Sequence, residues 1–167
     1  MKTDTAKLEN LLTQKTGTEF YTRVYEGHVG MEKQHTLGIA IAKAHNFDDI
    51  EGFAVRSILE NRGWGNGYVT IPTGHPLSGV SYKILTEAMD ITVHGGITFS
   101  GYSRNLRNLE HLEGEDTYGA WVFGFDTAHF GDTRLLDRDF VIEEAKRLRD
   151  QLERISDVKL IITLREA

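Results

Sequence analysis

The chain has 167 residues, with 25 acidic and 19 basic side chains, a net charge of -6 and no cysteine. This length is typical of one domain that buries a sufficient core without a disulfide, a metal or a partner. The lack of cysteine excludes disulfides, thiolate nucleophiles and sulfur-ligated zinc, and the acidic balance argues against long nucleic acid as a partner. A small anion such as a nucleotide stays a candidate ligand, because a few local donors can bind it.

The N-terminal residues carry an acid, Asp4, and no apolar run follows it. We therefore expect no signal peptide and no membrane span, and we expect a soluble protein of the cytoplasm. Leu8, Leu11 and Leu12 then recur at helical spacing before Gly17, which predicts an opening helix.

Strands and short helices are predicted through the middle of the chain. Residues 19–26 alternate as a half-buried strand does, and the apolar stretch 37–44 is interpreted as a second strand. A helix is predicted from Asp48 or Asp49 to Gly63. The next predicted elements are a strand at 67–71, a short helix near 81–88, strand segments at 91–93 and 97–99, and a strand at 120–125.

The clearest pattern is a helix at residues 139–155. One face of this helix is apolar and the other is charged. The charged face has acidic and basic side chains three or four positions apart, which indicates a solvated surface. A last strand is predicted at 159–164, and no repeat or linker marks a second domain. We therefore predict one α+β domain over residues 1–167, with a mixed or antiparallel sheet, a long C-terminal helix and a final strand. The apolar stripe of that helix consists of Val141, Ile142, Ala145, Leu148, Leu152 and Ile155.

Three polar segments with glycines carry the candidate chemistry. In the first, residues 67–79, both prolines of the chain stand four positions apart around Gly74 and His75. The resulting stiff turn either aims His75 into a pocket or is itself capped by the imidazole. His75 is therefore a candidate ligand-binding residue.

The second segment, residues 90–101, places His94 before two adjacent glycines, Gly95 and Gly96. Adjacent glycines permit positive φ and can leave backbone N–H groups bare for an anion or a polarised oxygen. Thr98 and Ser100 share one face if the following residues are extended, and can add hydroxyl contacts. The alternative is a glycine bulge beside a core histidine.

The third segment, residues 121–132, is an aromatic strand followed by Asp126, His129 and Asp132 in steps of three. That spacing can bring the three side chains together for either of two uses. They hold a divalent cation, or a carboxylate orients an imidazole for proton transfer. The alternative is that Asp126 caps a turn while His129 and Asp132 lie on the surface.

Two other residues are candidates for ligand contacts. Trp64, between two glycines, is either a core residue or a stacking platform for a base. Arg104 can meet a phosphate or lie in a solvated loop. No HExxH motif and no Walker loop is present.

The three segments also resemble a family of small bacteriophage and bacterial proteins. The shared motifs are GYVxIPxGHPL at residues 67–77, VHGGITFSG at 93–101 and GFDxAHxGD at 124–132. The resemblance implies a setting, namely an accessory gene of a phage or mobile element acting in the host cytoplasm. Small proteins of that kind often counter host defence by sequestering or cleaving nucleotide signals.

We expect the segments to form one site with His94, Asp126 and His129 as the catalytic residues. The first hypothesis is hydrolysis of a small phosphoester or nucleotide, with the histidines as acid and base or as ligands of a divalent metal ion. The second is a non-catalytic nucleotide sponge that uses the same pocket. The third is a protein-binding accessory whose polar segments are only turns. The cofactor and a homo-oligomeric state stay open, and the rim is expected to include His75 and Asp132.

Overall fold

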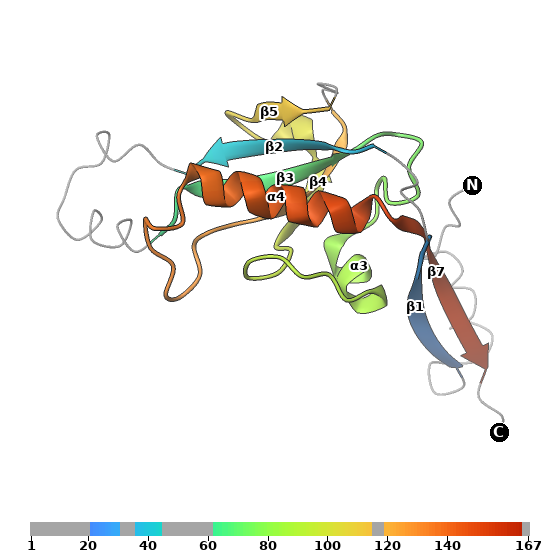
Figure 1. The fold of residues 1–167 in the computed structure, drawn as a ribbon. Helices are drawn as coiled ribbons and strands as arrows, with labels where there is room; N and C mark the ends of the chain where they lie inside the picture. The colour runs from blue at the N-terminus through green and yellow to red at the C-terminus, as the bar shows by residue number, and fades with distance from the viewer. Residues whose placement is uncertain (1–20, 31–35, 45–61, 115–118, 165–167) are drawn as a thin grey trace.

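The computed structural model describes residues 21–30, 36–44, 62–114 and 119–164. The helix predicted before Gly17 lies outside these ranges, as does the helix predicted from Asp48 or Asp49, apart from its end at Gly63. Within the described part, strands dominate the first two thirds and one long helix precedes the last strand (Figure 1).

A five-stranded sheet forms the centre of the molecule, and its neighbouring strands all pair antiparallel. Its middle strands are apolar and largely buried, as expected for strands covered on both faces. With the long helix and the final strand, this arrangement confirms the predicted α+β class. In spatial order the strands are β4 (Phe99–Tyr102), β6 (Trp121–Phe125), β3 (Gly65–Ile71), β2 (Gly38–Lys43) and β5 (Glu110–Glu113).

Helix α4 (Arg138–Leu152) lies across one face of this sheet (Figure 1). It begins at Asp137, whose carboxylate accepts a hydrogen bond from the Phe140 N–H at 2.9 Å and so caps the first turn. The helical residues of the predicted stripe pack against the sheet, and all but the half-buried Ile142 are buried. The main core therefore lies between α4 and the sheet.

The predicted C-terminal helix is too long by three residues, because the chain leaves the helix at Glu153. The Glu153 side chain is buried, and its carboxylate accepts a hydrogen bond from the Leu37 N–H at 3.0 Å. This contact ties the helix end to the entrance of β2. Ile155, predicted to be the last apolar residue of the helix, begins strand β7 (Ile155–Leu164).

The second face of the sheet carries a smaller apolar cluster. Tyr68 and Val122 are buried there beneath Leu106 and Leu109, which follow a 3-10 turn, η3 (Ser103–Asn105). The short helix α3 (Tyr82–Ala88) begins at a Ser81 cap and buries Leu85 in the main core, as the sequence predicted for residues 81–88. No described helix is long and apolar enough to cross a membrane.

Strand β1 (Tyr21–Val29) pairs with β7 in a separate two-stranded ribbon that extends past the end of α4 (Figure 1). β1 also contacts α3, where Gly27 leaves room for the Met89 side chain. On its outer face the ribbon carries His28, whose imidazole lies 2.5 Å from Asp157 through Nδ1 and 3.0 Å from Glu26 through Nε2.

Two predictions for the middle of the chain are corrected. Residues 91–93 are not a strand, and the segment predicted at 97–99 becomes a strand only from Phe99, where pairing with β6 begins. The intervening glycines take positive φ, which interrupts extended structure. Strand β5 was not predicted, because Glu110 and Glu113 at its ends leave no alternation of apolar and polar residues. Both carboxylates pair with basic side chains of α4.

Candidate functional site

Two of the three polar segments meet at one end of the central sheet. β4 begins where β6 ends, because the two strands are antiparallel and Phe99 lies opposite Gly124. Just before β4, the Thr98 N–H donates to the Gly124 carbonyl at 2.9 Å. The loop that carries His94 is therefore fixed beside the loop that follows β6.

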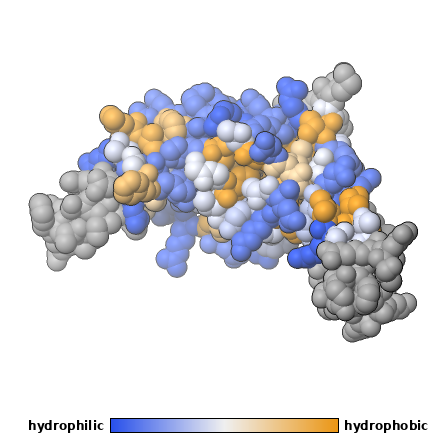
Figure 2. Space-filling view, turned by 90° about the horizontal axis from the view of Figure 1, so that it is seen from below, coloured by the Kyte–Doolittle hydropathy of each residue, from blue (hydrophilic) through white to orange (hydrophobic). Residues whose placement is uncertain are grey.

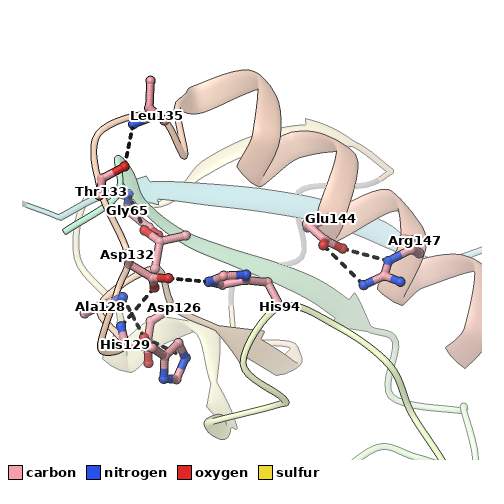
Figure 3. A network of polar contacts seen from close by, with 11 residues as sticks. Gly65, His94, Asp126, Ala128, His129, Asp132, Thr133, Leu135, Glu144 and Arg147 are labelled. Carbon is pink, nitrogen blue, oxygen red and sulfur yellow. Dashed lines mark hydrogen bonds and ion pairs between the residues drawn. The ribbon is translucent and has the colours of Figure 1, made fainter. Parts of the chain in front are cut away.

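The closest link between these loops is the contact between His94 and Asp132 (Figure 3). His94 Nε2 lies 2.9 Å from Asp132 Oδ1. The second carboxylate oxygen, Oδ2, accepts the His129 N–H at 2.9 Å, so both oxygens are used. Only 6% of Asp132 is exposed. A buried carboxylate with two donors holds both loops in place, so Asp132 is more central than the rim position expected for it.

Residues 129–132 form a tight turn that the sequence specifies well. The Asp132 N–H donates to the His129 carbonyl at 2.9 Å, and Gly131 at the third position has φ +89°. This is the geometry of a type II turn, in which the third position requires positive φ and favours glycine. The turn brings Asp132 back beneath His129.

A second histidine-carboxylate pair lies beside the first. His129 Nε2 is 3.2 Å from Asp126 Oδ1, which is ion-pair distance without hydrogen-bond alignment. Asp126 Oδ1 also accepts the Ala128 N–H at 3.0 Å, and Oδ2 accepts the Thr98 hydroxyl at 3.0 Å. The Asp126 carboxylate is therefore held from two loops and keeps its position next to the imidazole.

The two imidazole rings lie close together in a T-shaped arrangement. Their centroids are 5.8 Å apart at an interplanar angle of 63°, and Phe140 of α4 packs against His94 at 5.3 Å. The side chains of His94 and His129 are 25% and 33% exposed, so a small molecule can reach both. The geometry suits two groups that exchange protons with one ligand.

The adjacent glycines allow the His94 loop to lie close to the His129 ring. Gly95 has φ +67°, and a Cβ there would lie 2.1 Å from His129 Nε2. Gly96, at φ +81°, donates its N–H to the Val93 carbonyl at 2.9 Å. The expectation of two bare amides is thus corrected, because the turn itself uses the Gly96 donor. The main role of Gly95 is to let the His94 loop touch the His129 ring.

Thr127 was not predicted, although it fastens the site to the sheet. Its hydroxyl is buried, donates to the Gly65 carbonyl at 2.7 Å and accepts the Gly65 N–H at 3.2 Å. The side chain thereby joins the loop after β6 to the start of β3. The signal for this role was weak, since a hydroxyl residue between Asp126 and His129 also suits an ordinary turn.

His75 and Ser100 do not lie with His94 and His129. His75 is buried in its own turn, where Nδ1 accepts the Leu77 N–H at 3.0 Å. The turn of His75 follows the end of β3 that pairs with Trp121, the first residue of β6. The site lies at the other end of β6, about 13 Å away at the usual rise of an extended strand. Ser100 instead accepts the N–H of Tyr82 at 2.9 Å and so holds the start of α3.

Arg104 lies apart from the imidazoles, and Trp64 packs into the core. The Arg104 guanidinium is 4.7 Å from the ring centroid of Tyr102, which pairs with Trp121 at the far end of β6. Trp64 is at the near end of the sheet, but its side chain packs against the main core, and its backbone N–H donates to the Leu136 carbonyl at 2.8 Å. Its position favours the core interpretation.

The candidate metal ligands lie in two histidine-carboxylate contacts. Among the described residues, no three His, Asp or Glu side chains converge as a metal site. His94, Asp126 and His129, the candidate ligands, instead take part in two separate histidine-carboxylate contacts. A surface hollow of about 500 Å³ lies along the charged side of α4. Phe140, which packs against His94, lines this hollow, whereas the two histidines and their carboxylates do not.

No family model matches the chain, and neither a curated protein nor a solved structure matches it.

Proposed function

We propose that this protein hydrolyses a phosphoester bond in a small nucleotide-like molecule, with His94 and His129 as the proton-transferring groups. One observation carries the proposal: each imidazole has its own carboxylate, and the rings are 5.8 Å apart. Paired imidazoles with oriented carboxylates are a common arrangement for general acid-base catalysis.

Asp132 determines which nitrogen of His94 is available. A carboxylate can only accept a hydrogen bond, so the Nε2 atom beside it carries the proton and Nδ1 has the free electron pair. Nδ1 is therefore the atom that takes up a proton. The Asp132 carboxylate also fixes the orientation of the ring, which suits His94 to the role of general base.

His129 is the general acid in this proposal, because His94 takes the role of base and the Asp126 carboxylate, 3.2 Å from His129 Nε2, orients the second ring. His94 removes a proton from water as the water oxygen attacks phosphorus. The bond from phosphorus to the leaving oxygen breaks, and protonated His129 gives that oxygen a proton. One water is consumed, and proton exchange with solvent restores both histidines.

The biological setting is proposed from the motif resemblance. A phage or mobile-element protein that cleaves nucleotides would act in the host cytoplasm, on a nucleotide signal of host immunity. The net charge of -6 is compatible with a small substrate and unfavourable for a long polyanion.

A second candidate is sequestration of such a nucleotide without turnover. The observation that favours it is the burial of His129 Nε2 against Gly95, which leaves one nitrogen of that ring for exchange with a ligand. Recovery of the intact nucleotide after heat denaturation of a complex supports sequestration. Recovery of a cleaved product excludes it.

The test is phosphoester turnover of a panel of mono-, di- and cyclic nucleotides, followed by ³¹P NMR. His94→Ala and His129→Ala are each expected to lower turnover about 100-fold to 10,000-fold, the usual contribution of a general acid or base. His28→Ala on the distant ribbon is the matched control and is expected to keep full activity. Unchanged turnover in both site variants would overturn the proposal.

A further inference from the structure

A large aromatic side chain projects from the site into solvent. Phe130 lies between His129 and Asp132 in the sequence, and its relative exposure is 109%. Phenylalanine is usually buried, since burial of such a side chain contributes about 1.5–3 kcal/mol. Its full exposure between two site residues makes the ring available to a ligand that binds there.

The turn that carries Phe130 is fixed. Two hydrogen bonds of 2.9 Å join His129 to Asp132, one between backbone groups and one through the carboxylate. Phe130 occupies the second position of this turn, where the side chain points outward. Adjacent Cα atoms are about 3.8 Å apart, so the Phe130 ring stays within reach of a ligand that contacts His129.

We propose that Phe130 is a stacking platform for the base of the substrate, so that the substrate class is a nucleoside phosphate with an unpaired base. The inference rests on the proposed function, which supplies the phosphate, and it adds recognition of the base. Stacking on an aromatic side chain tolerates any base, because every base has a π face. The platform thus selects nucleotides over other phosphoesters.

A planar small ligand fits these observations better than a protein partner. Leu135, in the next turn, is also exposed, at 88%. Elsewhere, the apolar side chains on the face seen in Figure 2 form separate groups among hydrophilic ones. A stable protein interface needs about 1,000 Å² of well-packed surface. A single aromatic ring beside two ionisable pairs is instead suited to one flat, charged molecule.

The test compares three probes that differ by one part each: adenosine 5′-monophosphate, adenosine and ribose 5-phosphate. Binding to the full chain is measured by ¹H–¹⁵N NMR titration, and ³¹P spectra of the same samples report turnover. We expect the monophosphate to bind at least tenfold more tightly than ribose 5-phosphate, equivalent to about 1.4 kcal/mol. The Phe130→Ser variant should lose this preference, and Phe130→Trp should keep it.

Leu135→Ser is the matched control, because it removes an equally exposed apolar side chain from the adjacent turn. It is expected to bind all three probes as the wild type does. Equal binding of the monophosphate and ribose 5-phosphate, or an unaltered preference in Phe130→Ser, would overturn the inference. So would concentration-dependent line broadening that Phe130→Ser abolishes, since the ring would then serve self-association.

The two proposals fail in different ways. If ribose 5-phosphate binds at the site and is turned over but the base adds nothing, base recognition fails and hydrolysis stands. If adenosine binds through Phe130 but neither these probes nor the nucleotide panel is cleaved, hydrolysis fails and base recognition stands. If none of the probes binds, both are overturned.

Discussion

Asp132 and His94 are 38 positions apart in the sequence, and their side chains meet at 2.9 Å in a half-buried contact. The same carboxylate holds the backbone of His129. One acidic side chain therefore fixes the separation of the two histidines. Chemistry that needs both imidazoles at one substrate depends on this contact.

Asp132→Asn is expected to lower both stability and turnover. Its two partners, His94 Nε2 and the His129 N–H, both donate, whereas an amide has one accepting oxygen. One buried donor is left unsatisfied, or His94 changes tautomer and loses its free Nδ1. The free energy of unfolding should fall by about 1–3 kcal/mol, measured by urea denaturation. The exposed Asp150→Asn is the control, and equal stability of the two variants would contradict this account.

Removal of divalent cations is expected to leave the ligand-free protein unchanged. No three His, Asp or Glu side chains in the described ranges converge as ligands, and the site is held by hydrogen bonds between its own residues. Tm should be the same after dialysis against EDTA and after addition of Mg²⁺, Mn²⁺ or Zn²⁺. A rise of several degrees with one cation, lost in His94→Ala, would show that the histidines are ligands.

The sequence predicted the fold class and the meeting of the second and third segments, but not which strand ends coincide. β3 and β6 are antiparallel, with Ile71 opposite Trp121, so the segments that follow them leave the sheet at opposite ends. His75 is separated from His129 for this reason. Hydrophobic alternation identifies a strand and its exit, whereas strand direction depends on long-range pairing.

The pairing of the acids was predicted only in part. Asp126 lies beside His129, as expected, but Asp132 was assigned to the rim although it binds His94. Steps of three residues suggested a convergence of Asp126, His129 and Asp132 alone. The glycine turn at Gly131 directs the Asp132 carboxylate inward to a residue of another loop, and a local spacing rule cannot identify such a partner.

The pKa of His28 is expected to lie above its usual value of 6.5. The main cause is the hydrogen bond to Asp157, followed by the one to Glu26; both favour the protonated ring. A pKa raised by folding gives stability that is fully present below 6.5 and is lost as pH rises through the folded value. NMR titration of the His28 ring should show the shift, and Asp157→Asn should reduce it. A wild-type pKa at or below 6.5 would contradict the ion pairs of the ribbon.

Alanine at Gly95 and at Gly96 should separate the effect of backbone strain from the effect of contact with the His129 ring. Both glycines have positive φ, +67° and +81°, so either substitution is expected to cost about 1–2 kcal/mol of stability. Only at Gly95 would the new Cβ meet a neighbour, lying 2.1 Å from His129 Nε2, whereas at Gly96 nothing lies within 4 Å.

Gly95→Ala should therefore shift the ring resonances of His129 and reduce turnover at least tenfold beyond the effect of Gly96→Ala. Two-dimensional NMR of the imidazoles and denaturation curves of both variants provide the comparison. Equal effects of the two substitutions on His129 and on turnover would mean that the close approach of the His94 loop does not position the ring. A larger effect at Gly95 would show that the missing side chain is itself part of the site, because it lets the two histidines approach each other.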